Sequence, residues 1–225
     1  MHQHSNRRSF LKSGISLAAA GGISLIPFTS TANQAAEKNN VRDENPLCVI
    51  GPIAGYAPQI GTLVTMLNYN RVTVINLTKS LSAADLDHLI DPGANTIGAL
   101  LMHLAAVEKF YQINSFEGRQ EFNAEEKKLW NAGLGLGDSG RTEIKGKDVT
   151  FYHGLLEQGR QKTLQEFKKK DDKWLLAIDP IWSKEEKYNT YWKWFHVCEH
   201  EANHRGQISF LKSRLPGAKK AGTEG

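Results

Sequence analysis

One histidine-rich stretch constrains the fold more than any other part of this chain. Residues 196–215 read HVCEHEANHRGQISFLKSRL. On a helix with 3.6 residues per turn, His196, His200 and His204 fall on one narrow stripe, which Gln207 continues. Because the stripe is otherwise apolar, it is predicted to face a protein core. Two imidazoles four residues apart on such a face form a clamp for a divalent metal; the alternative is a set of hydrogen-bonded core histidines. The shared period of the three histidines favours the metal.

The remaining sequence shows four long helical patterns and no convincing strand, which predicts an all-α protein built as a four-helix bundle. The long helices are expected at residues 58–80, 95–116, 148–170 and 183–215. Asn95 is the predicted N-cap of the second helix, and Ser183 with Glu186 is the predicted capping box of the fourth. Shorter helical segments are expected after Ser82 and Asn123. The long connections before the third and fourth helices leave the topology open.

A third histidine ligand can come from either of two other helices. His103 lies in the apolar stripe of the second helix, so it is predicted to point into the core. A lone histidine in that position is more often a hydrogen-bonded core residue. Beside the pair His200 and His204, however, His103 becomes the natural third ligand. His153, near the start of the third helix, is the rival, and it ranks lower because it lies outside the central apolar stripe.

The first 32 residues are interpreted as a twin-arginine export signal. Residues 6–12 read NRRSFLK, and the weakly apolar stretch that follows is too short for a membrane span, which needs about 20 residues. Cleavage is expected at Ser30-Thr31-Ala32, which would give an exported, periplasmic protein with no stable membrane insertion. Residues 33–57 are interpreted as a linker, and residues 216–225 as a disordered tail.

Charge and cysteine content limit the expected partners. Removing Arg7, Arg8 and Lys12 with the signal from 28 basic residues leaves 25 basic against 24 acidic residues. This balance favours neither nucleic acid nor an anionic membrane surface as a partner. Cys48 and Cys198 could form a disulfide in an oxidising compartment, but their pairing cannot be read from sequence.

Of two further formal motifs, the first gives a less favoured alternative function, a zinc metalloprotease, and the second is rejected. His200 to His204 reads HEANH, the H-E-x-x-H pattern of zinc proteases, in which Glu201 would be the general base. Only 21 residues follow His204, and they contain no histidine to serve as a third ligand. The glycine-rich stretch 133–140 contains G-x-G-x-x-G, but no strand precedes it, so a dinucleotide site is not expected. We expect a mobile loop there.

The two histidine-bearing segments together resemble a known superfamily. Thr96-Ile97-Gly98 leads to HLAAVE at residues 103–108, and HxxxHRGQ stands at residues 200–207. Over about residues 56–215 the chain is similar to the DinB/YfiT-like superfamily of metal-dependent four-helix proteins. The resemblance implies a four-helix bundle with a long crossover connection, often dimeric, and one divalent metal held by His103, His200 and His204. Superfamily members include hydrolase-like proteins of unknown substrate, thiol-S-transferases and a thiol-dependent isomerase.

The ligand set indicates a catalytic site. Three neutral imidazoles leave a fourth metal position open, which is typical of catalytic zinc. Zn²⁺ is expected, with Ni²⁺ or Fe²⁺ as alternatives because imidazole suits all three. The predicted function is therefore that of an exported hydrolase or transferase acting on a small molecule. The alternative is a non-catalytic metal-binding or stress-related bundle, and a homodimer is open.

Further residues are candidates for the chemistry. Gln207 lies one turn beyond His204 and could hydrogen-bond a ligand. Glu108 and Glu201 are candidate bases, although a solvated helix surface is the favoured interpretation of both. His196 could orient substrate. The aromatic residues at the start of the fourth helix could pack in the core or wall a substrate pocket: Tyr188, Tyr191, Trp192, Trp194 and Phe195.

Overall fold

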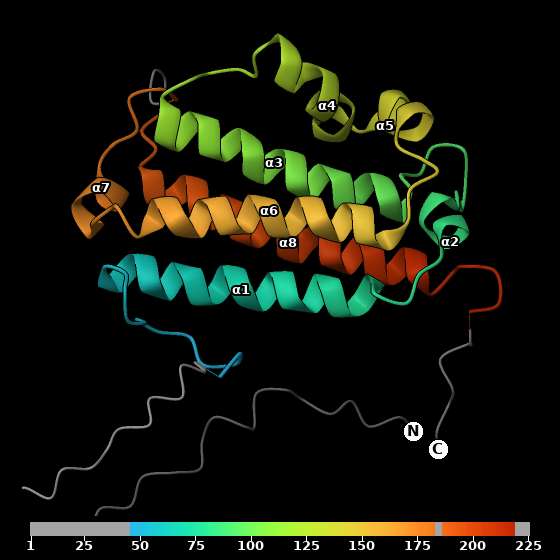
Figure 1. Ribbon diagram of the computed structural model, residues 1–225, viewed down its shortest axis with the longest axis horizontal. Coiled ribbons are helices and arrows are strands. Elements are labelled where there is room, and N and C mark those ends of the chain that lie inside the picture. The colour runs from blue at the N-terminus through green and yellow to red at the C-terminus, as the bar shows by residue number, and fades with distance from the viewer. Residues whose placement is uncertain (1–45, 183–185, 219–225) are drawn as a thin grey trace, which may run out of the picture. The chain divides into compact units, whose positions relative to one another are not determined.

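The computed structural model describes residues 46–182 and 186–218 (Figure 1). The predicted export signal, most of the linker, Ser183 and the end of the tail lie outside these residues. Within them the regular secondary structure is helical, which confirms the predicted all-α class. The eight helices of the described ranges are α1 (Pro58–Thr78), α2 (Ala83–Asp87), α3 (Ile97–Glu117), α4 (Ala124–Gly135), α5 (Gly137–Glu143), α6 (Val149–Phe167), α7 (Asp172–Leu176) and α8 (Thr190–Lys212).

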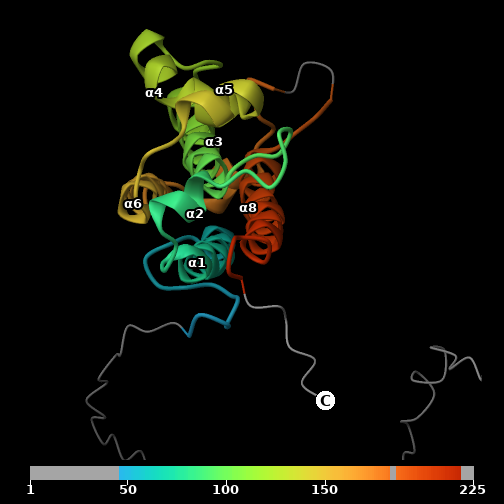
Figure 2. The same cartoon turned by 90° about the vertical axis from the view of Figure 1, so that its right-hand side faces the viewer.

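The four long helices α1, α3, α6 and α8 form a bundle in which α1 and α3 stand at opposite corners. Helix α3 packs against α6 and α8, and α1 packs against the same two helices, as the end-on view shows (Figure 2). Residues further along α1 contact residues further along α8, so these two helices run parallel. The same holds for α3 and α6. The chain between α3 and α6 must therefore return along the bundle. Helices α4 and α5 make this crossover on the outer side of α3 (Figures 1 and 2).

Local signals set most of the helix borders. Asn123 and Glu126 cap each other reciprocally at the start of α4, as predicted. The N-cap of α3 is Thr96, whose hydroxyl accepts from the Ala99 N–H, one residue beyond the predicted Asn95. The predicted start of α8 is wrong: the helix begins at Thr190, because the Asn189 side chain accepts from a backbone N–H in its first turn.

The glycine-rich stretch is also different from the prediction. Residues 133–140 are not a loop but the end of α4 and the start of α5, separated by a sharp turn at Leu136. Leu136 and Gly137 both have positive φ, 52° and 63°, which reverses the chain between the two helices. The turn makes a helix–turn–helix crossover, which is the part of the fold that reaches the histidines.

The bundle interior is apolar at both ends and charged at its middle. One group of buried side chains surrounds the start of α3, and another surrounds the end of α3, where Trp194, Phe167 and Tyr111 pack edge to face. Across the described residues, none of the helices is both long and apolar enough to span a membrane.

Candidate metal centre

Antiparallel packing of α3 on α8 brings the three predicted histidines together. His103 Nε2 lies 3.1 Å from His200 Nε2, which in turn lies 3.1 Å from His204 Nε2. One ligand atom from each of the three residues lies within 4.8 Å of the others. His200 and His204 meet because they are one turn apart on α8, and His103 faces them from α3. The predicted convergence of these side chains is thus confirmed.

Two hydrogen bonds fix which nitrogen points into the cluster. His103 Nδ1 donates to the Gly133 carbonyl oxygen at 2.8 Å, and His204 Nδ1 donates to Gln207 Oε1 at 2.8 Å. A neutral imidazole carries one proton, so both rings present a bare lone pair at Nε2. The hydrogen bonds described for His200 are the two to these rings. Two arrangements satisfy the distances: one proton on His200 Nε2 shared by its neighbours, or three lone pairs around a cation.

The environment keeps these rings neutral, which is the form that binds a metal. Burial lowers the pKa of His103 to about 4, an effect partly offset by its hydrogen bond to Gly133. Burial, with help from the neighbouring His204 and His103 rings, lowers the pKa of His200 to about 3. Burial also lowers the pKa of His204, against the opposing hydrogen bond to Gln207. Near pH 7 no ring repels an incoming cation.

The donor set fits a divalent transition metal. Imidazole nitrogens bind zinc at 2.0–2.1 Å, so two of them at a tetrahedral angle lie about 3.3 Å apart. The two shorter nitrogen separations here are 3.1 Å, which is close to that spacing. The Nδ1 atoms of His103 and His204 are held by a backbone carbonyl and a side-chain amide, as in known zinc sites. Three such nitrogens and no carboxylate favour zinc, nickel or iron over magnesium or calcium.

His196 borders the cluster without joining it. Its ring stands 5.6 Å from the His200 ring, centroid to centroid, and stacks on Trp192. The Tyr111 hydroxyl lies 2.7 Å from His196 Nδ1. Burial raises the pKa of Tyr111, so this hydroxyl keeps its proton and donates it to Nδ1. The other ring nitrogen, Nε2, lies 3.8 Å from Glu199 Oε1.

The structure places His153 elsewhere. His153 Nε2 is hydrogen-bonded to Thr78 Oγ1 at 2.9 Å, between α6 and α1. Burial lowers the pKa of His153, which keeps it a neutral partner of that hydroxyl. It does not belong to the cluster of His103, His200 and His204. The rival third ligand is therefore remote from the pair on α8.

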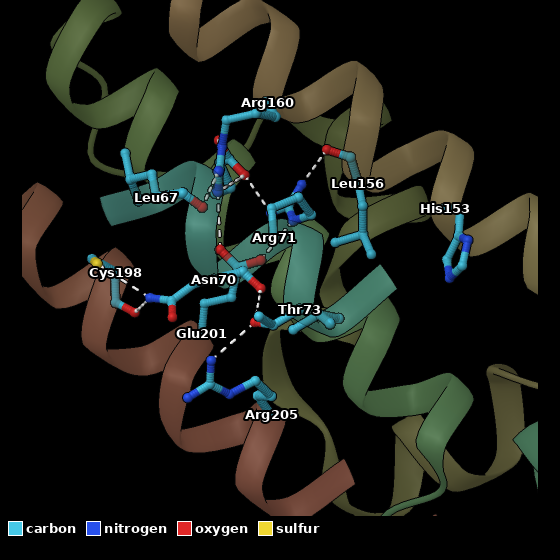
Figure 3. Close-up of polar contacts among 12 residues, drawn as sticks. Leu67, Asn70, Arg71, Thr73, His153, Leu156, Arg160, Cys198, Glu201 and Arg205 are labelled. Atoms are coloured by element: carbon cyan, nitrogen blue, oxygen red, sulfur yellow. Dashed lines mark hydrogen bonds and ion pairs between the residues drawn. The ribbon is translucent and has the colours of Figure 1, made fainter. Parts of the chain in front are cut away.

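The solvated surface expected for Glu108 and Glu201 is wrong. Both carboxylates are buried, at 1% and 2% exposure, and each pairs with Arg71 and Arg160. Figure 3 shows Glu201 beside the two arginines. The four charges come one from each long helix and cancel. Burial opposes ionisation of Glu108, but the guanidinium groups of Arg160 and Arg71 lower its pKa to about 2. Thr163 Oγ1 also donates to Glu108 at 2.7 Å. These carboxylates are therefore fully occupied as ion-pair partners.

The positions of the two arginines on their helices carry a usable signal. Arg71 occupies a position on the apolar face of its helix between Leu67 and Val74, where a charge needs a buried partner. Arg160 likewise falls in register with Leu156 and Thr163 on α6. Counting the charged residues on the apolar faces of the four long helices gives two arginines and two glutamates. The prediction overlooked this balance.

The aromatic residues at the start of α8 divide between two roles. Trp194 is fully buried in the core, whereas Phe195 is 53% exposed and Trp192 stacks on His196 at the edge of the cluster.

Both cysteines are free in this structure. Asn70 Nδ2 donates to the carbonyl and the sulfur of Cys198, on the side of α8 that faces α1 (Figure 3).

Comparison with known protein families finds a match that covers most of the described bundle. The family model described as mycothiol-S-transferase matches residues 62–217, which include the three clustered histidines and all four long helices except the first turn of α1. The chain belongs to the mycothiol-S-transferase family. This family is part of the DinB/YfiT-like superfamily, so the resemblance noted from the sequence is confirmed at that level. A search of curated proteins finds no match. Membership indicates a metal-dependent enzyme of transferase-like or hydrolase-like type that acts on a small molecule.

Proposed function

We propose that this protein is a zinc-dependent thiol transferase. It binds one metal ion through His103, His200 and His204 and joins the sulfur of a low-molecular-weight thiol, mycothiol or a close relative, to an electrophilic small molecule. The observation that carries the proposal is the convergence of three Nε2 atoms, two of them fixed as lone-pair donors by Gly133 and Gln207. The family match supports sulfur transfer over hydrolysis and over a non-catalytic metal site.

The reaction needs a thiolate, an electrophilic carbon and a leaving group. A divalent metal held by His103, His200 and His204 would supply a positive charge that lowers the pKa of a nearby thiol. The thiol proton passes to solvent, the sulfur forms a bond to the electrophilic carbon, and the leaving group departs with the electrons of the broken bond. No oxidant or reductant is required.

The protein's own residues prepare this step. Gly133 and Gln207 hold the rings of His103 and His204, so the ligand nitrogens do not have to reorganise when the site fills. His196, held by Tyr111 and Trp192, lies one turn from His200 and can contact either substrate. Glu108 and Glu201 are committed to their arginine partners and take no proton in this scheme.

The same proposal includes the location and assembly of the protein. The NRRSFLK motif at residues 6–12 supports export through the twin-arginine route. N-terminal sequencing of protein from the periplasm should begin after Ala32, and retention of Arg7 and Arg8 in mature protein would oppose export. The homodimer implied by the superfamily is tested by light scattering on the metal-loaded protein in solution.

The activity test measures loss of thiol when the metal-loaded protein is mixed with mycothiol and chlorodinitrobenzene. We expect metal-dependent release of chloride and formation of the sulfur conjugate. His200→Ala should abolish the reaction, because a ligand nitrogen is lost, whereas His153→Ala should retain it. Equal rates in metal-free and metal-loaded protein would contradict the proposal.

A further inference from the structure

A cavity opens between α3, α4 and α6, on a different side of α3 from the histidine cluster. Its volume is about 490 Å³, within the range of about 300–1,000 Å³ typical of small-molecule sites. Ala105, which lines it, lies about 200° around α3 from His103, whose Nε2 faces α8. None of the three clustered histidines lines the cavity. The proposed transfer reaction therefore does not use this space.

One buried side chain in the cavity wall has an unused hydrogen-bond acceptor. Gln112 is 3% exposed, and its Nε2 donates to the Gly159 carbonyl oxygen at 2.7 Å and to Thr163 Oγ1 at 2.9 Å. Its Oε1 accepts no hydrogen bond within the part of the chain that the structure describes, and it is not among the polar atoms sealed off from solvent there. Because Gln112 lines the cavity, a hydroxyl group of a bound molecule can donate to this oxygen.

Neutral amides continue along the α6 side of the cavity. Gln158, Gln161 and Gln165 line it at helical spacing, and all three side chains are exposed. A side-chain amide donates and accepts hydrogen bonds at once, and so does a hydroxyl group. A row of such amides therefore matches a molecule that carries several hydroxyl groups. Such a molecule does not need to be fully removed from water, so it also suits an open cavity.

The two lysines of the lining are already paired. Lys109 Nζ lies 3.3 Å from a carboxylate oxygen of Glu126, and Lys162 Nζ lies 2.8 Å from one of Glu166. An anionic ligand would have to compete with these carboxylates for the same ammonium groups. The lining therefore favours an uncharged ligand over an anion.

Trp130 supplies an aromatic surface on the α4 side. The side chain is partly buried against the apolar group around the start of α3, which holds its ring in place, and it also lines the cavity. The C–H face of a sugar ring is apolar and flat enough to stack on an indole, while the hydroxyl groups point outward from the edge of the sugar ring. An aromatic wall combined with amides is thus complementary to a carbohydrate.

We propose that this cavity is a carbohydrate site: it binds an uncharged sugar that stacks on Trp130 and hydrogen-bonds the glutamine amides, including Gln112 Oε1. The site is separate from the proposed transferase centre and does not rest on that function. Gly159 limits its size, because this residue lines the cavity and a Cβ added there would meet nothing within 4 Å. A larger side chain at Gly159 would therefore project into the site.

The test follows the tryptophan indole N–H signals by NMR while nitrogen-labelled, metal-loaded protein is titrated with maltose. Loss of one signal in Trp130→Phe identifies that of Trp130, and Trp192, 39% exposed on α8, is the internal reference for non-specific effects. Gly159→Leu fills the site. Gly154→Leu is the matched control, because Gly154 is on the same helix, does not line the cavity, and its added Cβ would also meet nothing within 4 Å. Maltose phosphate is the anionic counterpart of the probe.

We expect maltose to shift the Trp130 signal and to leave the Trp192 signal in place. Gly159→Leu should weaken maltose binding by at least about tenfold, because the inserted side chain occupies the ligand's volume, while Gly154→Leu leaves it unchanged. Maltose phosphate should bind no more tightly than maltose, because both lysines are paired.

Three results would overturn the site: no shift at Trp130, an equal shift at Trp192, or equal maltose affinity in the two glycine variants. Clearly tighter binding of maltose phosphate would overturn the assignment to an uncharged ligand. Thiol transfer without maltose binding would overturn this site alone, whereas maltose binding without thiol transfer would overturn the proposed function alone.

Discussion

Replacing Gly133 by alanine tests how closely α4 must approach α3 to hold the His103 ring. An added Cβ would lie 2.8 Å from Met102 Cγ, 3.2 Å from the Met102 carbonyl oxygen and 3.4 Å from Ala106 Cβ. Side-chain carbons do not tolerate such distances, so α4 has to move outward by several tenths of an ångström. The Gly133 carbonyl, 2.8 Å from His103 Nδ1, would move with it.

Two effects of different size should follow. Overpacking of the α3–α4 contact should lower the free energy of unfolding by about 1–3 kcal/mol. Weakening the hydrogen bond that orients a metal ligand should lower metal affinity by about 10–100-fold, as for other residues that support ligands from outside the coordination sphere. The crossover would then be shown to support the site and not only to connect helices.

The assay is zinc affinity by competition with a chelator of known affinity, combined with urea unfolding of the metal-free protein. Gly135→Ala is the matched control, because Gly135 is on the same helix and an added Cβ there would meet nothing within 4 Å. It should leave both quantities near wild type. If Gly133→Ala binds zinc as tightly as Gly135→Ala, the argument for the carbonyl's role is refuted.

Three more predictions follow from the contacts described above. Arg160→Ala should lower the free energy of unfolding in urea by about 3–5 kcal/mol, because it leaves the Glu108 charge under-compensated in the core. Arg119→Ala, at the surface, should lower it by about 1 kcal/mol or less. Similar losses in the two variants would contradict a buried network. The pKa of Glu108 is lower in the folded protein than its ordinary value of 4.5, so the ionised carboxylate stabilises the fold above that pH, and this stability is lost as the pH falls through about 2. The urea midpoint should therefore fall across that window in wild type and fall less steeply in Glu108→Gln. Parallel profiles of the two proteins would contradict this. Gln207→Ala should weaken zinc binding by about 10–100-fold, because His204 Nδ1 loses its hydrogen-bond acceptor. Gln207→Glu, which restores an acceptor oxygen, should recover most of the lost zinc affinity. Equal zinc affinity in wild type and both variants would show that Gln207 does not support the metal site.

Much of the fold and the core of the candidate site could be predicted from periodicity. Helical spacing placed His200 and His204 on one face, and the apolar stripe around His103 directed it inward. Both inferences depend only on local geometry, which a helix imposes wherever it forms. The positions of the long helices followed from the same patterns, apart from the start of α8.

The errors fall where tertiary contacts decide the outcome. Glu108 and Glu201 were expected in water because their arginine partners lie on other helices, far away in sequence. The glycines of residues 133–140 indicated flexibility, but α4 uses Gly133 to pack closely on α3. The acceptor of the hydrogen bond from His103 is a backbone carbonyl, which every residue has, so no sequence motif could predict this contact.

The measurement that tests the central claim most directly is the metal content of protein purified without added metal. Wild type, His103→Ala, His200→Ala and His153→Ala should be analysed side by side for zinc, nickel and iron. We predict about one equivalent of zinc in wild type and in His153→Ala, because His153 bonds Thr78 and lies outside the cluster, and a large loss in the other two variants. Wild type that remains metal-free after reconstitution, or a His103→Ala variant that keeps a full equivalent, would contradict a three-histidine metal centre.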